Sequence, residues 1–237
     1  MEAVTYTLDN EIAIVSLNSG ENRFNNEFLE NFLGILDEIE ADTDARTLVV
    51  TSSHEKIFSN GIDLDWLSGF INAGDIDGVK KFLYRQNDMF RRLVTYPLVT
   101  VAAISGHAFA GGAILSCAFD FRLMRSDRGY FCFPEVDLGI PFLPGMLELL
   151  KSAIPLYKMD EMQYLGSRLT AAECQQHHII TKACHRDDLM SETLAFARTC
   201  NKTRHTIGEM KARMNRHIVH ALDVEDPPYI EQGRLVP

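Results

Sequence analysis

The chain has 237 residues, of which 46% are hydrophobic and 24% charged, and its formal net charge is −10. This length fits one large domain, or one domain with a smaller appendage, and it is long enough to bury a substantial core. The negative charge argues against broad nucleic-acid binding, which usually needs a basic face, so any anionic ligand must meet a local basic patch.

The termini and the cysteines indicate the compartment. The N-terminal MEAVTYTLDN lacks the basic region and apolar run of a secretory signal, and no apolar run reaches the length of a membrane span. We therefore expect no membrane partner, and a location in the bacterial cytoplasm or in a eukaryotic organelle matrix. The five cysteines are widely spaced without a CxxC motif, which predicts free thiols in a reducing compartment. The polar C-terminal EQGRLVP is expected to fray.

The first half of the chain alternates strands and helices. VTYTLD and EIAIVSLN predict a hairpin around Asp9-Asn10. FLENFLGILDEIEAD predicts a helix, and RTLVVTSS a strand. IFSNGIDLDWL predicts a glycine turn that enters a helix. An amphipathic helix is then expected from Asp77 to Tyr96, followed by a buried strand at LVTVAAIS.

The second half becomes mostly helical. A helix is expected from about Gly111, followed by the strands DFRLMRS and GYFCF. From Pro141–Leu150 to Ala221 the pattern is helical, interrupted by a short strand in HHIITKACH. Alternation of strands and helices followed by a helical tail predicts an α/β fold with crossover connections. We place the core in residues 1–190 and a helical C-terminal region in residues 191–237.

Two segments share the order of buried strand, glycine turn and helix: TLVVTSSHEKIFSNGIDLDWL and LVTVAAISGHAFAGGAILS. Free N–H groups at a helix start point outward with the positive end of the dipole, and two such donors aimed at one point can hold a developing oxyanion. Gly111 and Gly112 would let a ligand approach without a Cβ in the way. Tight helix–strand packing is the alternative reason for these glycines. The phosphate-binding motifs GxGxxG and GxxxxGK[ST] do not occur.

The segments FSNGIDLDWL, ISGHAFAGGAILSCAFDFRLMRSD and FCFPEVDLGIP occur in the order and spacing of the crotonase superfamily, also called the enoyl-CoA hydratase/isomerase family. NRFNNEFLENFLGIL resembles the opening helix signature of that family, and the resemblance covers about Val4 to Thr181. It implies a spiral of ββα turns, two nearly perpendicular sheets and a helical C-terminal region. It also implies acyl-CoA substrates, no cofactor apart from the CoA within the substrate, and a homotrimer or a dimer of trimers.

The resemblance also assigns roles to residues. The backbone N–H groups of Ile62 and Gly111 would form an oxyanion hole for a thioester enolate. Hydratases carry a glutamate three residues after that glycine, where this chain has Ile114. A second catalytic position, in a "PE" step, is Glu135. The substrate-binding residues that it implies are Asn60, Gly61, Asp63, Trp66, Ala110, Gly112, Ile114 and Phe133.

Glu135 alone can serve an isomerase. One carboxylate can take a proton from C2 of a 3-enoyl thioester and return it at C4. This pattern resembles the 3,2-enoyl-CoA isomerases of fatty acid β-oxidation. An apolar site would raise the pKa of this carboxyl by desolvation. The alternative is a structural glutamate that caps a helix or pairs with Arg122 or Arg128. Asp137 is expected to face away, because neighbouring residues of a strand point to opposite sides.

Other readings remain open. The chain could be a hydratase, another enolate-forming enzyme such as a decarboxylase or hydrolase, or a non-catalytic acyl-CoA-binding protein. Asp63 and Asp65 could in principle bind a metal, but at a helix start they complement the dipole, so we predict no metal site. Trp66 is expected in the wall of the acyl pocket or in the core. The candidate cations for the CoA phosphates and adenine are Arg23, Lys56, Lys80, Lys81, Arg85, Lys211 and Arg213.

Overall fold

A computed structural model describes residues 3–233, so the last four residues of the expected frayed end lie outside the described residues. Its larger sheet has six strands. In spatial order they are β1 (Val4–Asp9), β2 (Ile12–Leu17), β4 (Thr47–Ser52), β7 (Val99–Ile104), β9 (Phe121–Arg125) and β11 (Lys182–Cys184). Only the hairpin β1–β2 is antiparallel, and every other neighbouring pair in this sheet is parallel. The connections between parallel strands therefore cross over through helices.

The described residues also form a smaller sheet and a short strand pair. The smaller sheet has the parallel order β10 (Phe131–Cys132), β8 (His107–Phe109) and β5 (Ile57–Ser59). The pair consists of β3 (Arg23–Phe24) and β6 (Gly61–Ile62). The predicted α/β fold with two main sheets is confirmed, with this pair in addition.

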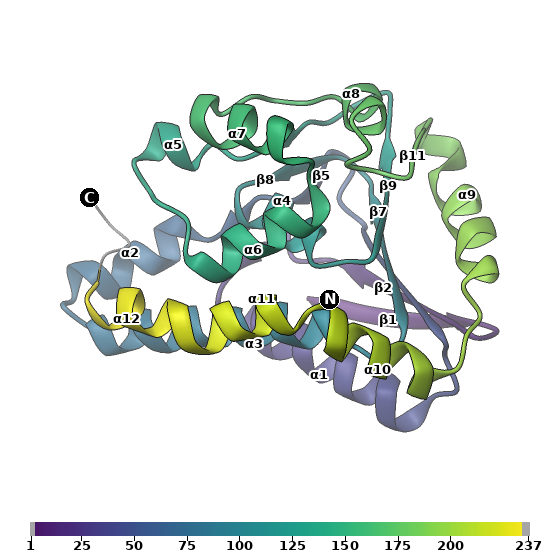
Figure 1. Cartoon of the computed structure of the whole chain (residues 1–237), viewed down its shortest axis with the longest axis horizontal. Helices are drawn as coiled ribbons and strands as arrows, with labels where there is room; N and C mark the ends of the chain where they lie inside the picture. The colour runs from purple at the N-terminus through teal and green to yellow at the C-terminus, as the bar shows by residue number, and fades with distance from the viewer. Residues whose placement is uncertain (1–2, 234–237) are drawn as a thin grey trace.

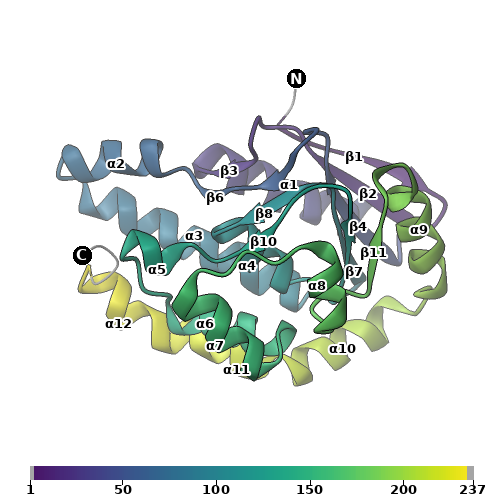
Figure 2. The same cartoon turned by 90° about the horizontal axis from the view of Figure 1, so that it is seen from above.

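The helices occupy both faces of the larger sheet (Figures 1 and 2). They are α1 (Asn26–Asp42), α2 (Leu64–Asn72), α3 (Ile76–Val94), α4 (Gly111–Cys117), α5 (Glu135–Leu138), α6 (Pro144–Ala153), α7 (Leu156–Leu165), α8 (Ala171–Gln176), α9 (Arg186–Thr199), α10 (Arg204–Met214), α11 (Arg216–His220), the π-helical η1 (Ala221–Glu225) and α12 (Asp226–Glu231). No helix of the described residues is long and apolar enough to cross a membrane.

The central strands are apolar on both faces, as expected for parallel strands covered by helices on each side. Leu48 and Val50 of β4 join the main core with α1 and α3, while Val49 between them faces the opposite side with Leu189 of α9. Helix α1 begins at an N-cap, because Asn25 Oδ1 accepts a hydrogen bond from the Phe28 N–H at 2.9 Å. All five cysteines are free and buried, as predicted.

The boundary that we placed after residue 190 falls inside α9. This helix packs against β4, β7 and β9, and Thr47 of β4 donates a hydrogen bond to the Ala197 carbonyl. Helix α9 therefore belongs with the core, and the C-terminal helical region begins with α10. In Figure 1, α10, α11 and α12 follow one another in a row, and α12 packs against α3.

Candidate active site

The two glycine turns that the sequence singled out touch each other. Gly61 in β6 has a φ of +74°, and a Cβ added there would lie 2.4 Å from the Gly111 nitrogen. A Cβ added to Gly112 would lie 2.1 Å from the Ser59 carbonyl oxygen. Both distances are impossible for a real Cβ, so close contact between two backbones requires these glycines. Tight packing, the alternative reason given for Gly111 and Gly112, is therefore correct for Gly112, and the same kind of contact at Gly61 brings the two turns together.

Two backbone N–H groups meet at this contact. The Asp63 N–H donates to the Phe24 carbonyl at 3.0 Å, and successive N–H groups of a strand point to opposite edges, so the Ile62 N–H points away from β3. Gly111 is the first residue of α4 and has no acceptor within that helix. A Cβ built on Gly111 would lie 3.3 Å from the Ile62 nitrogen. The two donors are thus close enough to bind one oxygen atom.

Ala110 holds the second turn in a strained conformation. Its φ of 49° and ψ of −128° are unusual for a residue with a Cβ, and such conformations cost about 1–3 kcal/mol. The Ala110 N–H donates to the Cys132 carbonyl at 3.0 Å. This hydrogen bond ties the donor turn to β10, the strand that precedes Glu135.

Glu135 is the first residue of α5 and is 7% exposed. Its Oε2 is buried and has no hydrogen-bond partner among the described residues. Desolvation raises the pKa of Glu135 to about 7, and its own backbone N–H opposes the shift. Ion pairing with Arg122 does not occur, because that guanidinium donates to the carbonyls of Phe119, Ser116 and Ile179. Glu135 therefore has the environment of a proton-transfer group rather than that of a paired structural carboxylate.

The donors and the carboxyl face one cavity of about 450 Å³. Helices α2, α3, α5 and α6 surround it at one end of the molecule (Figure 2). Its wall is mainly apolar, and six of the predicted residues line it: Asn60, Ile62, Ala110, Gly111, Ile114 and Glu135. The cavity therefore combines a small polar centre with an apolar channel, as small-molecule sites usually do.

Five predicted substrate-binding residues lie outside this wall: Gly61 and Gly112, which form the backbone contact described above, and Asp63, Trp66 and Phe133. Asp63 is the N-cap of α2 and accepts a hydrogen bond from the Trp66 N–H at 3.2 Å. Trp66 turns from the cavity to pack its ring against Phe70 and Phe82, with centroids 4.8 and 5.1 Å away. Phe133 is fully buried behind the wall. These three residues support the site without lining it.

Asp137 is exposed, as expected, but for a different reason. The strand β10 ends at Cys132, and Asp137 lies on the short helix α5 rather than on a strand. Strand alternation therefore does not determine its direction, and on a strand it would have put Glu135 and Asp137, two residues apart, on the same side, so that part of our interpretation was wrong.

Gln86 is a cavity residue that the sequence analysis missed. It lines the wall on α3 and is fully buried. Val79 and Leu83 line the same cavity seven and three residues earlier, so Gln86 lies on the apolar face of its helix. A polar residue in register with apolar ones was the signal available in the sequence.

Most of the predicted CoA-binding cations are already engaged in ion pairs. Lys80 pairs with Glu231, Arg85 with Glu30, Arg213 with Glu209 and Arg23 with Glu21, each at 2.7 Å. Lys211 is buried against Asp120 at 2.6 Å. Lys56 and Lys81 are exposed. Within residues 3–233, no cluster of three or more His, Cys, Asp or Glu side chains could hold a metal ion.

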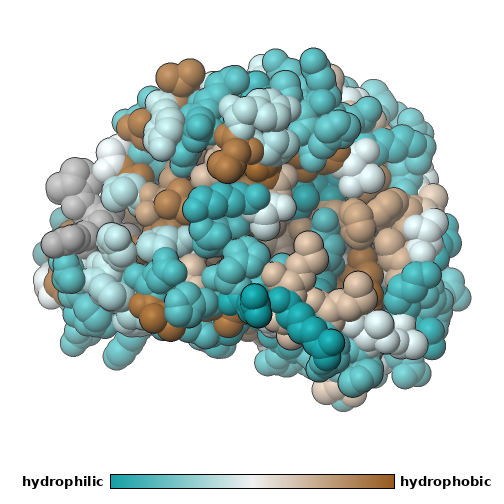
Figure 3. All heavy atoms as spheres, viewed as in Figure 1, coloured by the Kyte–Doolittle hydropathy of each residue, from teal (hydrophilic) through white to brown (hydrophobic). Residues whose placement is uncertain are grey.

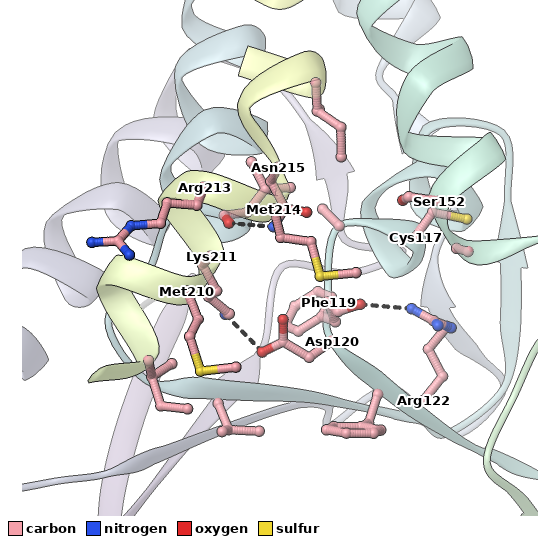
Figure 4. Close-up of a pocket in the computed structure, with 17 residues that line it drawn as sticks. Cys117, Phe119, Asp120, Arg122, Ser152, Met210, Lys211, Arg213, Met214 and Asn215 are labelled. Carbon is pink, nitrogen blue, oxygen red and sulfur yellow. Dashed lines mark hydrogen bonds and ion pairs between the residues drawn. The ribbon is translucent and has the colours of Figure 1, made fainter. Parts of the chain in front are cut away.

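A larger cavity of about 810 Å³ lies elsewhere, between α10 and the start of β9 (Figure 4). Hydrophobic residues gather in the hollow above α10 in Figure 3, on a face that is otherwise mostly hydrophilic. The charged side chains that line it already have partners: Lys211 pairs with Asp120, and Arg122 binds backbone carbonyls. Arg213 in the same wall pairs with Glu209, so among the described residues this cavity offers no unpaired charged side chain, and the smaller cavity is the better candidate for chemistry.

Comparison with known proteins agrees with this geometry. A sequence model of the enoyl-CoA hydratase/isomerase family matches residues 7–226. Enoyl-CoA delta isomerase 2, peroxisomal, of Arabidopsis thaliana is 34% identical over 139 residues, which are 57% of this chain and 57% of that protein. The probable enoyl-CoA hydratase echA8 of Mycobacterium bovis is 26% identical over 91% of this chain and 82% of its own length.

The fold is also found among solved structures. A crystal structure of a probable enoyl-CoA hydratase from Mycobacterium tuberculosis superposes with a TM-score of 0.88 at 22% identity, over 98% of this chain and 96% of that one. At this identity the likeness concerns the fold alone.

Proposed function

The chain belongs to the enoyl-CoA hydratase/isomerase family, and from this premise we propose that it is an isomerase that converts a 3-enoyl-CoA into the conjugated 2-enoyl-CoA. The family acts on acyl-CoA thioesters, so CoA enters as part of the substrate and no separate cofactor is needed. The observation that carries the proposal is a single buried carboxyl, Glu135, in the cavity that also contains the Ile62 and Gly111 N–H groups.

In the proposed reaction the thioester oxygen lies between the two N–H donors. The Glu135 carboxylate takes a proton from C2, and the electron pair moves into the thioester to form an enolate whose oxygen accepts both hydrogen bonds. The double bond then reforms between C2 and C3 as the Glu135 carboxyl returns the proton to C4. The pKa near 7 suits both half-reactions, because the group exchanges its proton readily at neutral pH.

The main alternative is hydration. Hydration by the two-carboxylate mechanism needs a second acid or base, and the position three residues after Gly111 carries Ile114, a buried aliphatic residue that lines the cavity. Among residues 3–233, Glu135 is the only ionisable side chain in the cavity wall. This supports isomerisation over hydration, although proteins named as isomerases and as hydratases are both among the relatives.

In the decisive experiment, purified protein is incubated with trans-3-hexenoyl-CoA, and the absorbance of the conjugated 2-enoyl thioester is measured over time. We expect turnover by the wild type. Glu135→Gln should lose about 10²–10⁴-fold in kcat, because it removes the proton-transfer group, while binding of the ester is kept. If the wild type binds the ester without converting it, the isomerase proposal fails and a binding role gains weight. Conversion that survives in Glu135→Gln would place the proton transfer elsewhere.

The biological setting forms part of the same proposal. A 3-enoyl-CoA arises when an unsaturated fatty acyl chain is shortened, so we place the enzyme in β-oxidation. One relative is named as peroxisomal, which is consistent with an organellar setting for that protein. Assembly into a homotrimer or a dimer of trimers is likewise proposed by analogy with the family.

A further inference from the structure

Gln86 is buried in the acyl cavity without a hydrogen-bond partner. It is 0% exposed, and both its Nε2 and its Oε1 are buried and unpaired among the described residues. The next residue on α3 differs in part: Asn87 Nδ2 donates to Asp226 Oδ2 at 2.8 Å, and only its Oδ1 is buried without a partner among the described residues. The N–H groups of Asn87 therefore find a carboxylate partner, whereas around Gln86 neither the N–H groups nor the carbonyl of the amide finds one.

The surroundings of Gln86 make this placement costly. The cavity wall near α3 is formed by apolar residues such as Val79, Leu83, Phe142 and Met146. A primary amide has two N–H donors and one carbonyl acceptor, and burying it unpaired is disfavoured. A leucine or methionine at this position would avoid the cost and fit the apolar face of the helix. The amide is therefore best explained by a partner that enters the cavity.

The charge of the cavity limits what that partner can be. In the part of the chain that the structure describes, Glu135 is the only ionisable residue of the wall, and no lysine, arginine or histidine lines it. A carboxylated acyl chain would meet a negative site with no cation to pair with. A neutral hydroxyl both donates and accepts, so it can bind the amide carbonyl and the amide N–H groups of Gln86.

We propose that Gln86 is a specificity-determining residue that binds a hydroxyl group on the acyl chain of the substrate, beyond the carbons that exchange protons. This inference rests on the proposed acyl-CoA function of the same cavity. A plain alkyl chain would displace water from the amide and leave it unpaired, whereas a hydroxylated chain would replace the lost hydrogen bonds. Sites built to hydrogen-bond a substrate hydroxyl discriminate strongly against analogues that lack it.

The test measures binding rather than turnover, so it remains informative if isomerisation fails. Calorimetry would compare hexanoyl-CoA and octanoyl-CoA with their counterparts that carry one hydroxyl at positions 5 to 8. We expect at least one hydroxylated ester to bind about 10–100-fold more tightly than its parent. In Gln86→Leu that preference should fall to within about twofold, and the parent esters should bind more tightly because no amide is left unpaired.

The control is Leu83→Met, which changes the shape of the same wall without adding or removing a polar group. It should keep the hydroxyl preference, and thermal melting would verify that both variants are folded. The proposal is overturned if the wild type binds each hydroxylated ester and its parent equally, or if the preference survives in Gln86→Leu. In either case a bound water is the partner of the amide. Failure to bind any acyl-CoA overturns this proposal and the proposed function together. A hydroxyl preference without turnover of trans-3-hexenoyl-CoA supports this inference while contradicting the isomerase.

Discussion

Glu135 links the chemistry of the site to the stability of the protein. Burial raises its pKa from an ordinary value of 4.5 to about 7. Between these two values the folded state binds more protons than the unfolded state, so the free energy of unfolding falls as pH rises through this window. The loss is about 3 kcal/mol once Glu135 is ionised. Asp226 acts in the same direction, because burial raises its pKa from 3.8 to about 6.

Replacing Glu135 by a neutral side chain of the same shape should remove its contribution to the pH dependence of stability. We expect Glu135→Gln to be about 2–3 kcal/mol more stable than the wild type at pH 8, and of nearly equal stability at pH 5, where the wild-type carboxyl is protonated. Urea denaturation at the two pH values measures this difference. Glu209→Gln, at an exposed ion pair, is the control and should change little at either pH. An equal effect of Glu135→Gln at both pH values would show that the shifted pKa is not its cause.

At the scale of elements, the contact between α4 and β5 sets the positions of the donors. A Cβ on Gly112 would lie 2.1 Å from the Ser59 carbonyl oxygen, and this atom belongs to the backbone of a strand. Helix α4 carries the Gly111 N–H, whereas the chain after β5 carries the Ile62 N–H. Any widening of this contact therefore separates the two donors.

Gly112→Ala should widen that contact. We expect a loss of about 3 kcal/mol in stability, from overpacking against backbone, and a loss of turnover of about 10²-fold in the protein that remains folded. Chemical denaturation and activity at a temperature where the variant is folded measure the two effects. Gly34→Ala makes the same change in α1, where nothing lies within 4 Å of the added Cβ, and it should gain about 1 kcal/mol. Wild-type activity in Gly112→Ala would contradict the role of this contact.

The elements near the site also show what a sequence can predict. The two glycine turns were predictable, because glycine at a strand–helix turn has a local physical reason. The end of β10 was not predicted. Pro134 has no N–H group, and the chain turns into a short helix there, so Glu135 and Asp137 are arranged by helical rather than strand geometry. Gln86 was missed because its place in the cavity wall depends on residues distant in the sequence, such as Ile114 and Met146, that line the same wall in the folded chain.

At the scale of the whole molecule, alternation of strands and helices predicted the fold class, but the spatial order of strands depends on pairings between distant segments. The C-terminal region shows the same limit. The sequence predicts helices there, yet nothing local indicates that α9 covers the larger sheet while α12 packs against α3. Contacts between distant residues decide this arrangement, and one arginine makes several of them.

Arg204 at the start of α10 fastens the C-terminal region to the end of α1. Its guanidinium donates to the carbonyls of Ala45 at 2.7 Å, Glu40 at 2.8 Å and Thr43 at 2.6 Å. Helix α1 has no basic residue in its own last turn, so Arg204 supplies the positive charge that its terminal carbonyls favour. The planar fork of arginine suits three acceptors at once, whereas a lysine ammonium is a single point charge.

We therefore expect Arg204→Lys to lower the free energy of unfolding by about 1–2 kcal/mol, although the charge is kept. Hydrogen exchange should increase more in α10 than in the strands of the larger sheet, because the substitution weakens a tether and leaves the core packing intact. Arg213→Lys is the matched control. Its side chain is 80% exposed and pairs with Glu209 on the same helix, so the same change should have almost no effect. If the two variants behave alike, the C-terminal helices are held by their apolar contacts with α3 and α6 rather than by Arg204.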